Sequence, residues 1–327
     1  MKIIGLGNAL VDVLVQLDND DIINKLNYPK GGMQLIGNED IPKIISYIEL
    51  LPSTMKSGGS SANTIHGLAC LGADCGFVGK VGNDKLGDFY IKDLDSANVK
   101  TIINKSETTT GRAYTLITPD TERTFATYLG AAIELDVDDL NSIPFANYDI
   151  LHIEGYLIQN TSLVETSMKI AKENGLQISI DLASYNVVEA QRDFLSRIIP
   201  EYVDIVFANE EEARAYTGLN PYDALQTIAE QCDVAIVKIG KEGSLILADG
   251  ETYKIDIIPV KTLDTTGAGD QYAAGFLYGY INKLGFKKCG KIGALLAGKV
   301  IENYGARISS NLWDEILQTT ESIIKEN

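Results

Sequence analysis

The sequence predicts an α/β protein with three layers, in which helices cover both faces of a mostly parallel central sheet, beside a small β-sheet lid. From residue 136 onward, short apolar runs alternate with amphipathic helical patterns, as in βαβ units. Two turns of small residues, at 57–64 and 264–270, each open a further helical pattern. A Thr-rich stretch at 101–128 has the β-rich pattern of a hairpin instead. These three observations together favour one sheet-based domain with a lid.

Composition sets the outer limits on function. With 327 residues, of which 45% are hydrophobic, the chain suits a single large domain over residues 1–327. A formal net charge of −17 argues against nucleic-acid or anionic-membrane partners. The four cysteines lack metal-ligand spacing, which favours free thiols in a reducing compartment. No basic leader and no apolar run of membrane-spanning length is seen, so we expect a cytoplasmic protein.

The N-terminal apolar runs predict two strands, at Ile3–Leu6 and Leu10–Leu17. Gly5-Leu6-Gly7 begins a dinucleotide-binding pattern, but Leu10 stands where that pattern requires a small residue, and a strand follows instead of a helix. A nicotinamide-dependent dehydrogenase is therefore disfavoured. Asp12 lies inside the second run, where a carboxylate is costly without partners. It is either a ligand contact at a strand end or an outward-facing residue.

Two segments, at about 10–37 and 101–130, predict the lid. The first holds a short polar helix, a Pro-Lys-Gly-Gly turn and a short strand. The second holds β-runs at 112–118 and 123–127 around a Pro-Asp-Thr-Glu turn. An exposed lid sheet could pair with a second copy to form a homodimer, or the insert at 18–32 could cover it.

The first small-residue turn suits a polyol. Gly58 and Gly59 permit close backbone approach, and Asn63 lies one turn into the helix that follows. An amide both donates and accepts hydrogen bonds, as sugar hydroxyls require. The alternative is that Ser60 or Ser61 is an ordinary N-cap.

Polar residues follow the predicted parallel strands, at the sheet edge where ligands collect. Glu154, Asp181, Asn209 and Gly240 follow apolar runs at 150–153, 177–180, 203–207 and 234–238. Asn209 with Glu212 one turn later could hold Mg²⁺ through water molecules, or the carboxylates could only complement the helix dipole. Gly240 to Gly243 forms a turn between two strands and is either a hinge or a ligand contact.

The second small-residue turn predicts an anion site. An apolar, strand-like approach at 255–263 leads into Asp264-Thr265-Thr266-Gly267-Ala268-Gly269-Asp270, and a helix begins at about Gly269. Amide groups and the positive end of the helix dipole there suit a phosphoryl group. Asp270 could accept a proton from an attacking hydroxyl, or could only complement the dipole. Neither a P-loop nor the protein-kinase motifs are present.

Together, Gly58-Gly59-Ser60-Ser61-Ala62-Asn63 and Asp264 to Asp270 resemble the two signature motifs of the PfkB family, the ribokinase-like carbohydrate and nucleoside kinases. The likeness runs nearly end to end, because the remaining polar positions fall in family order: Gly7-Asn8 with Asp12, Gly79–Asp84 with Gly87, Asn209 with Glu212, and Gly240 with Gly243. The resemblance implies a ribokinase-like fold and transfer of the γ-phosphoryl group of ATP, with Mg²⁺, to a hydroxymethyl group of a sugar or nucleoside.

The resemblance also implies roles for individual residues. Asp270 would be the base, and the amides of Gly267, Ala268 and Gly269 would stabilise the phosphoryl group. The acceptor would be bound by Asn8, Asp12, Gly58, Gly59 and Asn63. The nucleotide would lie near Asn209, Lys238, Gly240, Gly243, Thr265 and Asn303. Glu212 would hold Mg²⁺ through water, and Asp264 matches a segment that binds a monovalent cation such as K⁺ in some members.

Within the family, several stretches look more like adenosine-kinase-type members, which makes adenosine kinase the narrower alternative and places Glu154 near the acceptor. They are residues 5–12, the insert ending at 30–33, and residues 152–156. Thr266 instead matches the sugar-kinase form, and Gln271-Tyr272 replaces the usual pair after Asp270. The acceptor therefore stays open. A non-catalytic sugar- or nucleotide-binding regulator on the same fold is the other alternative, and the intact Asp270 turn counts against it.

Overall fold

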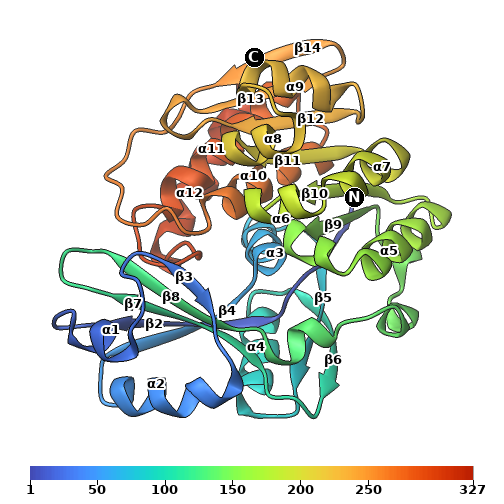
Figure 1. Ribbon diagram of the computed structural model, residues 1–327. Helices are drawn as coiled ribbons and strands as arrows, with labels where there is room; N and C mark the ends of the chain where they lie inside the picture. Colours follow the sequence, from blue (N-terminus) through green and yellow to red (C-terminus); the bar gives the residue numbers. More distant parts are fainter. Residues whose placement is uncertain (327) are drawn as a thin grey trace.

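The computed structural model describes residues 1–326 as a nine-stranded sheet covered by helices on both faces, with a five-stranded sheet beside it (Figure 1). The predicted three-layer α/β architecture with a mostly parallel sheet and a small second sheet is confirmed. The two sheets lie at an angle to one another (Figure 1), and residues of both line one cavity.

The large sheet has the order β14-β13-β12-β11-β10-β9-β1-β5-β6. Seven of its strands are parallel: β1 (Ile3–Leu6), β5 (Cys75–Gly82), β6 (Lys100–Ser106), β9 (Ile150–Glu154), β10 (Gln177–Asp181), β11 (Ile205–Asn209) and β12 (Val234–Lys238). The chain then turns back through two antiparallel edge strands, β13 (Ser244–Ala248) and β14 (Glu251–Ile255). The central strands are almost wholly buried because both faces are covered, which explains their continuous apolar runs.

Two hydrophobic cores lie on the two faces of the large sheet. One contains side chains of α3 (Ser60–Cys70), α4 (Lys85–Ser96), α10 (Ala268–Ile281), α11 (Phe286–Val300) and α12 (Trp313–Lys325). The other contains side chains of α5 (Thr161–Glu173), α6 (Tyr185–Ala190), α7 (Arg192–Tyr202), α8 (Glu210–Thr217) and α9 (Pro221–Ala229). Short 3₁₀ helices connect the elements at 38–40, 130–134, 138–142, 145–147, 155–159, 240–242 and 310–312.

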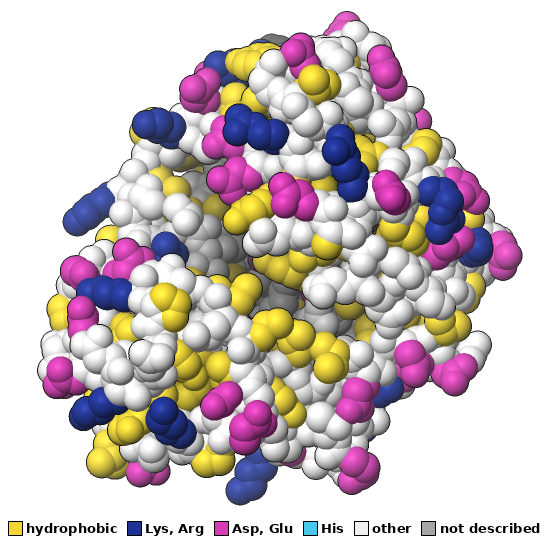
Figure 2. Space-filling model, in the orientation of Figure 1, with side chains coloured by type: hydrophobic (Ala, Val, Ile, Leu, Met, Phe, Trp, Pro, Cys, Tyr) yellow, Lys and Arg dark blue, Asp and Glu magenta, His cyan; other side chains and the backbone are white. Residues whose placement is uncertain are grey.

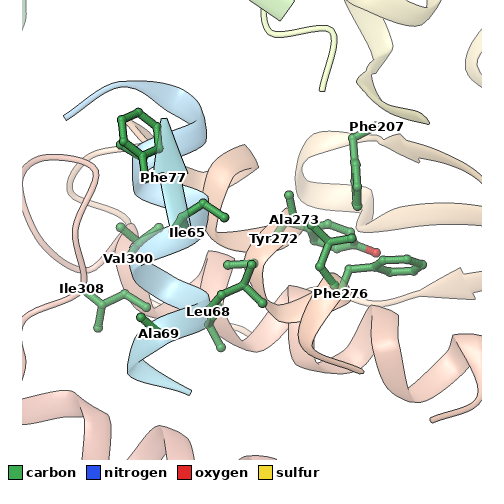
Figure 3. Close-up of a cluster of buried hydrophobic side chains, with 14 of the residues drawn as sticks. Ile65, Leu68, Ala69, Phe77, Phe207, Tyr272, Ala273, Phe276, Val300 and Ile308 are labelled. Carbon is green, nitrogen blue, oxygen red and sulfur yellow. The ribbon is translucent and has the colours of Figure 1, made fainter. Parts of the chain in front are cut away.

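Helices α3 and α10, which begin at the two small-residue turns, pack against each other in the first core (Figure 3). Ile65 and Leu68 of α3 are completely buried beside α10. Phe276 of α10 meets Phe207 of β11 edge to face, with ring centroids 5.4 Å apart. Because these contacts fix both helices on the sheet, the two turns are held side by side at its edge.

The small sheet has the order β3-β8-β7-β2-β4. Its strands are β3 (Met33–Leu35), β8 (Arg123–Tyr128), β7 (Gly111–Ile117), β2 (Leu10–Gln16) and β4 (Ser53–Gly58). Val11, Val13 and Val15 of β2 are buried in the same cluster as residues of α1 (Asp21–Leu26) and α2 (Ile41–Ile48). Asp12 and Leu14, on the other face of β2, line the cavity described below. The chain therefore covers the outer face of its lid with its own insert.

The structure corrects three sequence expectations. Residues 101–130 were expected to lie in the lid, but β6 is the edge strand of the large sheet, and β4 takes a place in the lid instead. The approach at 255–263 is not a strand, since β14 ends at Ile255 and residues 256–263 follow the cavity wall without regular structure. The single helix expected at 186–198 is divided into α6 and α7.

Two further observations concern the whole described chain. None of its helices is both long enough and apolar enough to cross a membrane. Its cysteines, Cys70, Cys75, Cys232 and Cys289, are all free thiols, as their spacing predicts.

Candidate active site

A cavity of about 990 Å³ opens where the carboxyl ends of β10, β11 and β12 meet the start of α10 and the inner face of the small sheet. Figure 2 shows the molecule hollowed between the small sheet and the helices of the large sheet. The cavity collects most of the site residues expected from sequence: Asp12, Gly59, Asn63, Asn209, Glu212, Lys238, Gly240, Gly243, Thr265, Gly267, Ala268, Gly269 and Asp270. It does not include Asn8, Gly58, Glu154, Asp264 or Asn303.

The turn before α10 has the geometry expected of an anion site. Gly267 has a φ of +75°, and a Cβ there would lie 2.5 Å from the Cα of Ala306, so the turn requires glycine. The N–H of Ala268 donates to the carbonyl of Thr265 (3.2 Å) and closes the turn. The N–H groups of Gly269 and Asp270 have no backbone acceptor in the described chain, as at any helix start. A small anion could accept from these amides.

Lys238 adds a cation to the same place. Its Nζ lies 3.0 Å from the point where a Cβ of Gly269 would stand, so the ammonium group covers the first turn of α10. Nζ also donates to Oδ2 of Asp181 (2.8 Å). Burial opposes the charge of Lys238, but Asp181 and Glu212 outweigh burial and raise the pKa of Lys238. The lysine is therefore charged at neutral pH.

The Asp270 carboxylate is held at the mouth of the same helix. Its Oδ1 accepts from Oγ of Ser60 (2.7 Å), and its Oδ2 accepts from Nδ2 of Asn63 (2.9 Å). Burial raises the pKa of Asp270 to about 6, although these two hydrogen bonds and Lys238 act to lower it. A carboxylate with this pKa is mostly ionised at pH 7 and can still accept a proton.

Asn209 and Glu212 form a capping box at the start of α8. Oδ1 of Asn209 accepts from the N–H of Glu212 (2.9 Å), and Oε2 of Glu212 accepts from the N–H of Asn209 (2.7 Å). A second bond joins the Asn209 amide to Oε1 of Glu212 (2.6 Å). Burial raises the pKa of Glu212 to about 7. The pair therefore has a structural task whatever it binds.

The wall beside this capping box is rich in carboxylates, since Asp181, Glu210, Glu211 and Glu212 all line the cavity. A polyphosphate on this wall would be repelled unless a divalent cation accompanied it. The described residues hold no group of three or more acidic, His or Cys side chains able to bind a metal directly. The oxygen donors present fit a Mg²⁺ ion that keeps water in its coordination shell.

Glu154 and Asn8 lie behind the cavity and not in it. Oε1 of Glu154 accepts from the N–H and the Nδ2 of Asn8 (3.0 and 2.5 Å), and Oε2 accepts from the N–H of Ser61 (3.0 Å). Burial raises the pKa of Glu154 to about 7. Glu154 therefore ties the link between β1 and β2 to the start of α3 and does not line the cavity, so the structure does not support its expected approach to the acceptor.

The glycine pair before α3 makes room for Asp12. Gly59 has a φ of +102°, and a Cβ there would overlap the carbonyl oxygen of Asn8. A Cβ on Gly58 would overlap the Asp12 carboxylate, so Gly58 shapes the cavity without lining it. Burial raises the pKa of Asp12 to about 7, with Arg307 acting to lower it. Asp12 therefore faces the cavity from within β2, which excludes the outward-facing alternative and leaves the ligand contact as a prediction.

Asp264 does not fit a monovalent cation, because a guanidinium group already neutralises it. Its Oδ1 accepts from Arg123 of β8 and from the N–H of Thr266, and its Oδ2 accepts from the N–H of Gly305. Nη1 of Arg123 also donates to Oγ1 of Thr266 (3.0 Å). This ion pair joins the small sheet to the anion turn.

Asn303 is likewise turned away from the cavity. Its Nδ2 donates to the carbonyl of Lys299 (3.4 Å), and its Oδ1 accepts from Oγ of Ser309 (3.0 Å). The expected contact between Asn303 and the nucleotide is therefore not supported.

Three polar residues of this region were not predicted to act in the site: Ser60 beyond its capping role, Arg123 and Arg307. A signal for Arg307 does exist, because it is a lone basic residue between apolar neighbours, as Asp12 is a lone acidic one. Arg123 stands among other polar residues of a hairpin and carries no such signal.

Comparison with known proteins agrees with this geometry. The model of the pfkB family of carbohydrate kinases matches residues 51–313. The chain belongs to this family. It is accordingly a sugar or nucleoside kinase, which phosphorylates an alcohol group, and ATP is the phosphoryl donor expected for the family.

Individual relatives differ in the acceptor that their names give. The crystal structure of adenosine kinase from Sinorhizobium meliloti is 32% identical, with a TM-score of 0.86 over 97% of this chain and 99% of that chain. A nucleoside kinase from Methanocaldococcus jannaschii is 30% identical over 290 residues, 86% of this chain and 91% of that protein. A 5-dehydro-2-deoxygluconokinase from Geobacillus thermodenitrificans is 28% identical over 293 residues, 84% of this chain and 87% of that protein.

Proposed function

We propose that this pfkB-family kinase transfers the γ-phosphoryl group of ATP to a hydroxymethyl group of an uncharged acceptor, a nucleoside in the first place, with Asp270 as the base. The observation that carries the proposal is the position of the Asp270 carboxylate. It lies beside free helix amides and Lys238 at the junction of the two sheets, held by Ser60 and Asn63. A base and an anion site therefore face one space.

The acceptor would lie under the small sheet, against Asp12, Gly59 and Asn63, and the nucleotide would lie along the other end of the cavity. Asn209, Gly240, Gly243 and Thr265 line that other end, together with residues of α11. As the acceptor oxygen bonds to the γ-phosphorus, its proton passes to Asp270 and the bond from phosphorus to ADP breaks.

Lys238 and the amides of Gly269 and Asp270 would balance the charge on the transferring group. Bound Mg²⁺, reached through water by Glu212 and the neighbouring carboxylates, would neutralise phosphate charge against the acidic wall. Most of the rate would then come from alignment and charge stabilisation.

Charge at the acceptor end favours an uncharged molecule. The cationic side chains that line the cavity are Lys238, which is paired with Asp181, and Lys241, which is exposed beyond the end of β12. Asp12 places a carboxylate where the acceptor would lie, and a gluconate-type acceptor would bring a second one. Leu14 and Phe125 of the small sheet add an apolar wall, which suits the face of a nucleobase.

Release of ADP, measured with a coupled assay, tests the proposed acceptor class. The panel is adenosine, inosine, ribose, fructose and 2-keto-3-deoxygluconate, each with Mg·ATP. We expect the highest kcat/KM with adenosine or inosine. A preference for the sugar acid would contradict an uncharged acceptor and leave the kinase assignment intact. ATP binding without ADP release on an extended acceptor panel would instead favour a regulator.

The variant Asp270→Asn tests the base. It should keep the fold and ATP affinity and lower kcat by at least about 10², because the amide cannot accept the proton. Asp223→Asn is a matched control, since Asp223 lies in the first turn of α9, away from the cavity. Near wild-type turnover in Asp270→Asn would remove Asp270 from the mechanism.

A further inference from the structure

Arg307 is a buried arginine that the proposed reaction does not use. It lies in the segment between α11 and α12, is 8% exposed and does not line the cavity. Its Nη2 donates to the carbonyl oxygen and to Oγ of Ser57 (2.5 and 2.7 Å), and its Nε donates to Oδ1 of Asn63 (3.2 Å). Burying a guanidinium group costs free energy unless its N–H groups are hydrogen-bonded, so the buried Arg307 requires these bonds.

The bond to Asn63 fixes which end of the amide faces Asp270. Arginine can only donate, so it selects Oδ1 of Asn63 and leaves Nδ2 on the opposite side. There Nδ2 donates to Oδ2 of Asp270 (2.9 Å). A flipped amide would bring its NH₂ group against Arg307 and its oxygen against the carboxylate, both of which are repulsive. Without Arg307, only Asp270 itself would select the orientation.

Other bonds hold Arg307 and Asn63 in register with Asp270. Ser57, which receives Nη2 of Arg307, donates its N–H and Oγ to Asp93 of α4 (2.9 and 2.7 Å). Gln271, the residue after Asp270, donates Nε2 to the carbonyls of Asn63 and Ala306 (both 3.2 Å). The arginine, the amide and the carboxylate therefore form one connected network that begins at the last strand of the small sheet.

We propose that Arg307 is a positioning residue, which acts through Asn63 to aim the Asp270 carboxylate and to keep it ionised. The proposal rests on the proposed function, since it assigns Arg307 a part in the task of Asp270. The competing explanation is a purely structural arginine that joins β4 to α3. The two explanations differ in whether the effect of removing Arg307 on turnover depends on Asn63.

A double-mutant cycle of Arg307→Met and Asn63→Ala separates the two explanations. In the otherwise wild-type enzyme, Arg307→Met should lower kcat by at least about tenfold with KM for ATP changed less than about twofold, because the base is misaligned while the nucleotide end is untouched. In the Asn63→Ala background the same change should lower kcat by less than about twofold, since the intermediary is already gone. Equal losses in both backgrounds would overturn the proposal.

The protonation of Asp270 gives a readout that does not depend on turnover. The hydrogen bond from Asn63 lowers the pKa of Asp270, and Arg307 holds Asn63 in place for it, so Arg307→Met should weaken this bond and raise that pKa. A ¹³C NMR titration of the carboxyl would measure it. Five other ionisable groups interact electrostatically with Asp270. They are Asp12 of β2, Glu154 of β9, Asp181 of β10, Lys238 of β12 and Tyr156. Both proteins contain these groups, but the charge of Arg307 also lowers the pKa of Asp12, so the two titrations are compared in an Asp12→Asn background. An unchanged or lowered pKa would contradict the proposal.

Two further variants keep the test decisive. Arg307→Lys replaces Arg307→Met if the latter does not fold. The lysine ammonium group keeps the positive charge but cannot form all the bonds that Arg307 makes to Ser57 and Asn63. Arg307→Lys should therefore also lower kcat, and this loss should also vanish in the Asn63→Ala background. Arg192→Met is the matched control, since Nε of Arg192 donates to the carbonyl of Tyr216 (2.8 Å) far from Asp270. It should lower stability and leave kcat unchanged. Absence of turnover in the wild type would instead refute the proposed function.

Discussion

Four carboxyl groups in or behind the cavity have a raised pKa, and their hydrogen-bond partners distinguish them. Burial raises the pKa of Asp12, Glu154 and Glu212 to about 7, and that of Asp270 to about 6. Both carboxylate oxygens of Glu154 accept hydrogen bonds, from Asn8 and Ser61, and both oxygens of Glu212 accept hydrogen bonds from Asn209. Asp270 combines contact with the cavity, two side-chain donors and a nearby lysine. At the scale of single residues, the proposed base is therefore distinguished by its partners and not by its residue type.

The pH dependence of kcat follows from the state of Asp270. A base must be deprotonated, and burial raises its pKa to about 6, so activity should be full above that pH and fall as the pH drops through it. Initial rates between pH 5 and pH 8 at saturating substrates would locate this acid limb. Asp12→Asn is the control, because the pKa of Asp12 is also raised, to about 7. If the fall of kcat at low pH disappears in Asp12→Asn, the titrating group is Asp12 and not Asp270.

At the scale of elements, sequence predicted the buried parts well and the exposed parts poorly. The parallel strands are covered on both faces, so their apolar runs mark β1, β9, β10 and β12 to within about a residue. Strand β4 was missed because four of its six residues are exposed and its Ser-Thr-Met-Lys run has no apolar alternation. The apolar run at 257–260 lines the cavity, and an apolar cavity lining resembles a strand when only the sequence is seen.

The site was predictable only where a local pattern carried it. The two glycine turns and Asp270 form contiguous motifs, and the structure brings them together. Arg123 and Arg307 act through partners more than 140 residues away in the chain, so no spacing rule points to them. Asn8 and Glu154 were placed in the site by resemblance, but their bonds to each other were not visible in the sequence.

The turn that opens α10 predicts different results for two neighbouring glycines. Gly267→Ala should lose at least about 1 kcal/mol of unfolding free energy, because φ is positive and the new Cβ meets the backbone of Ala306. Gly269→Ala should keep or raise stability, since it lies in the helix, and should lower turnover because its Cβ meets the Lys238 ammonium. Urea unfolding and initial rates would measure both effects. Full turnover in Gly269→Ala would show that Lys238 is not needed over this turn.

At the scale of the whole molecule, the function depends on how the small sheet is joined to the large one. Helices α1 and α2 pack on the outer face of the small sheet, so this face needs no second copy to cover its valines. On the inner side, Arg123 reaches Asp264, and Ser57 receives Arg307. Both bonds connect a strand of the small sheet to residues that contact the turn before α10 or the Asp270 network. Movement of the small sheet over the acceptor would therefore also move the residues around the turn before α10.

The pair of Arg123 and Asp264 leads to a prediction about monovalent cations. Because the guanidinium group neutralises Asp264, replacing K⁺ by tetramethylammonium should leave wild-type turnover unchanged. Arg123→Ala leaves a carboxylate that is 1% exposed with only the amides of Thr266 and Gly305 as donors. A small cation could then take the vacated place, so K⁺ should stimulate this variant. Initial rates in the two salts at equal ionic strength would measure the difference.

Arg123→Lys provides the control for that experiment, because it keeps a positive charge on β8 and should stay insensitive to K⁺. Hydrogen exchange gives the structural half of the same test. If the ion pair fastens the lid, amides of β7 and β8 should exchange faster in Arg123→Ala, while β10 and β11 in the large sheet should not change. Strong K⁺ activation of the wild type would mean that Arg123 leaves Asp264 during turnover. Faster exchange throughout the molecule would show that the pair supports the fold as a whole and not the junction between its two sheets.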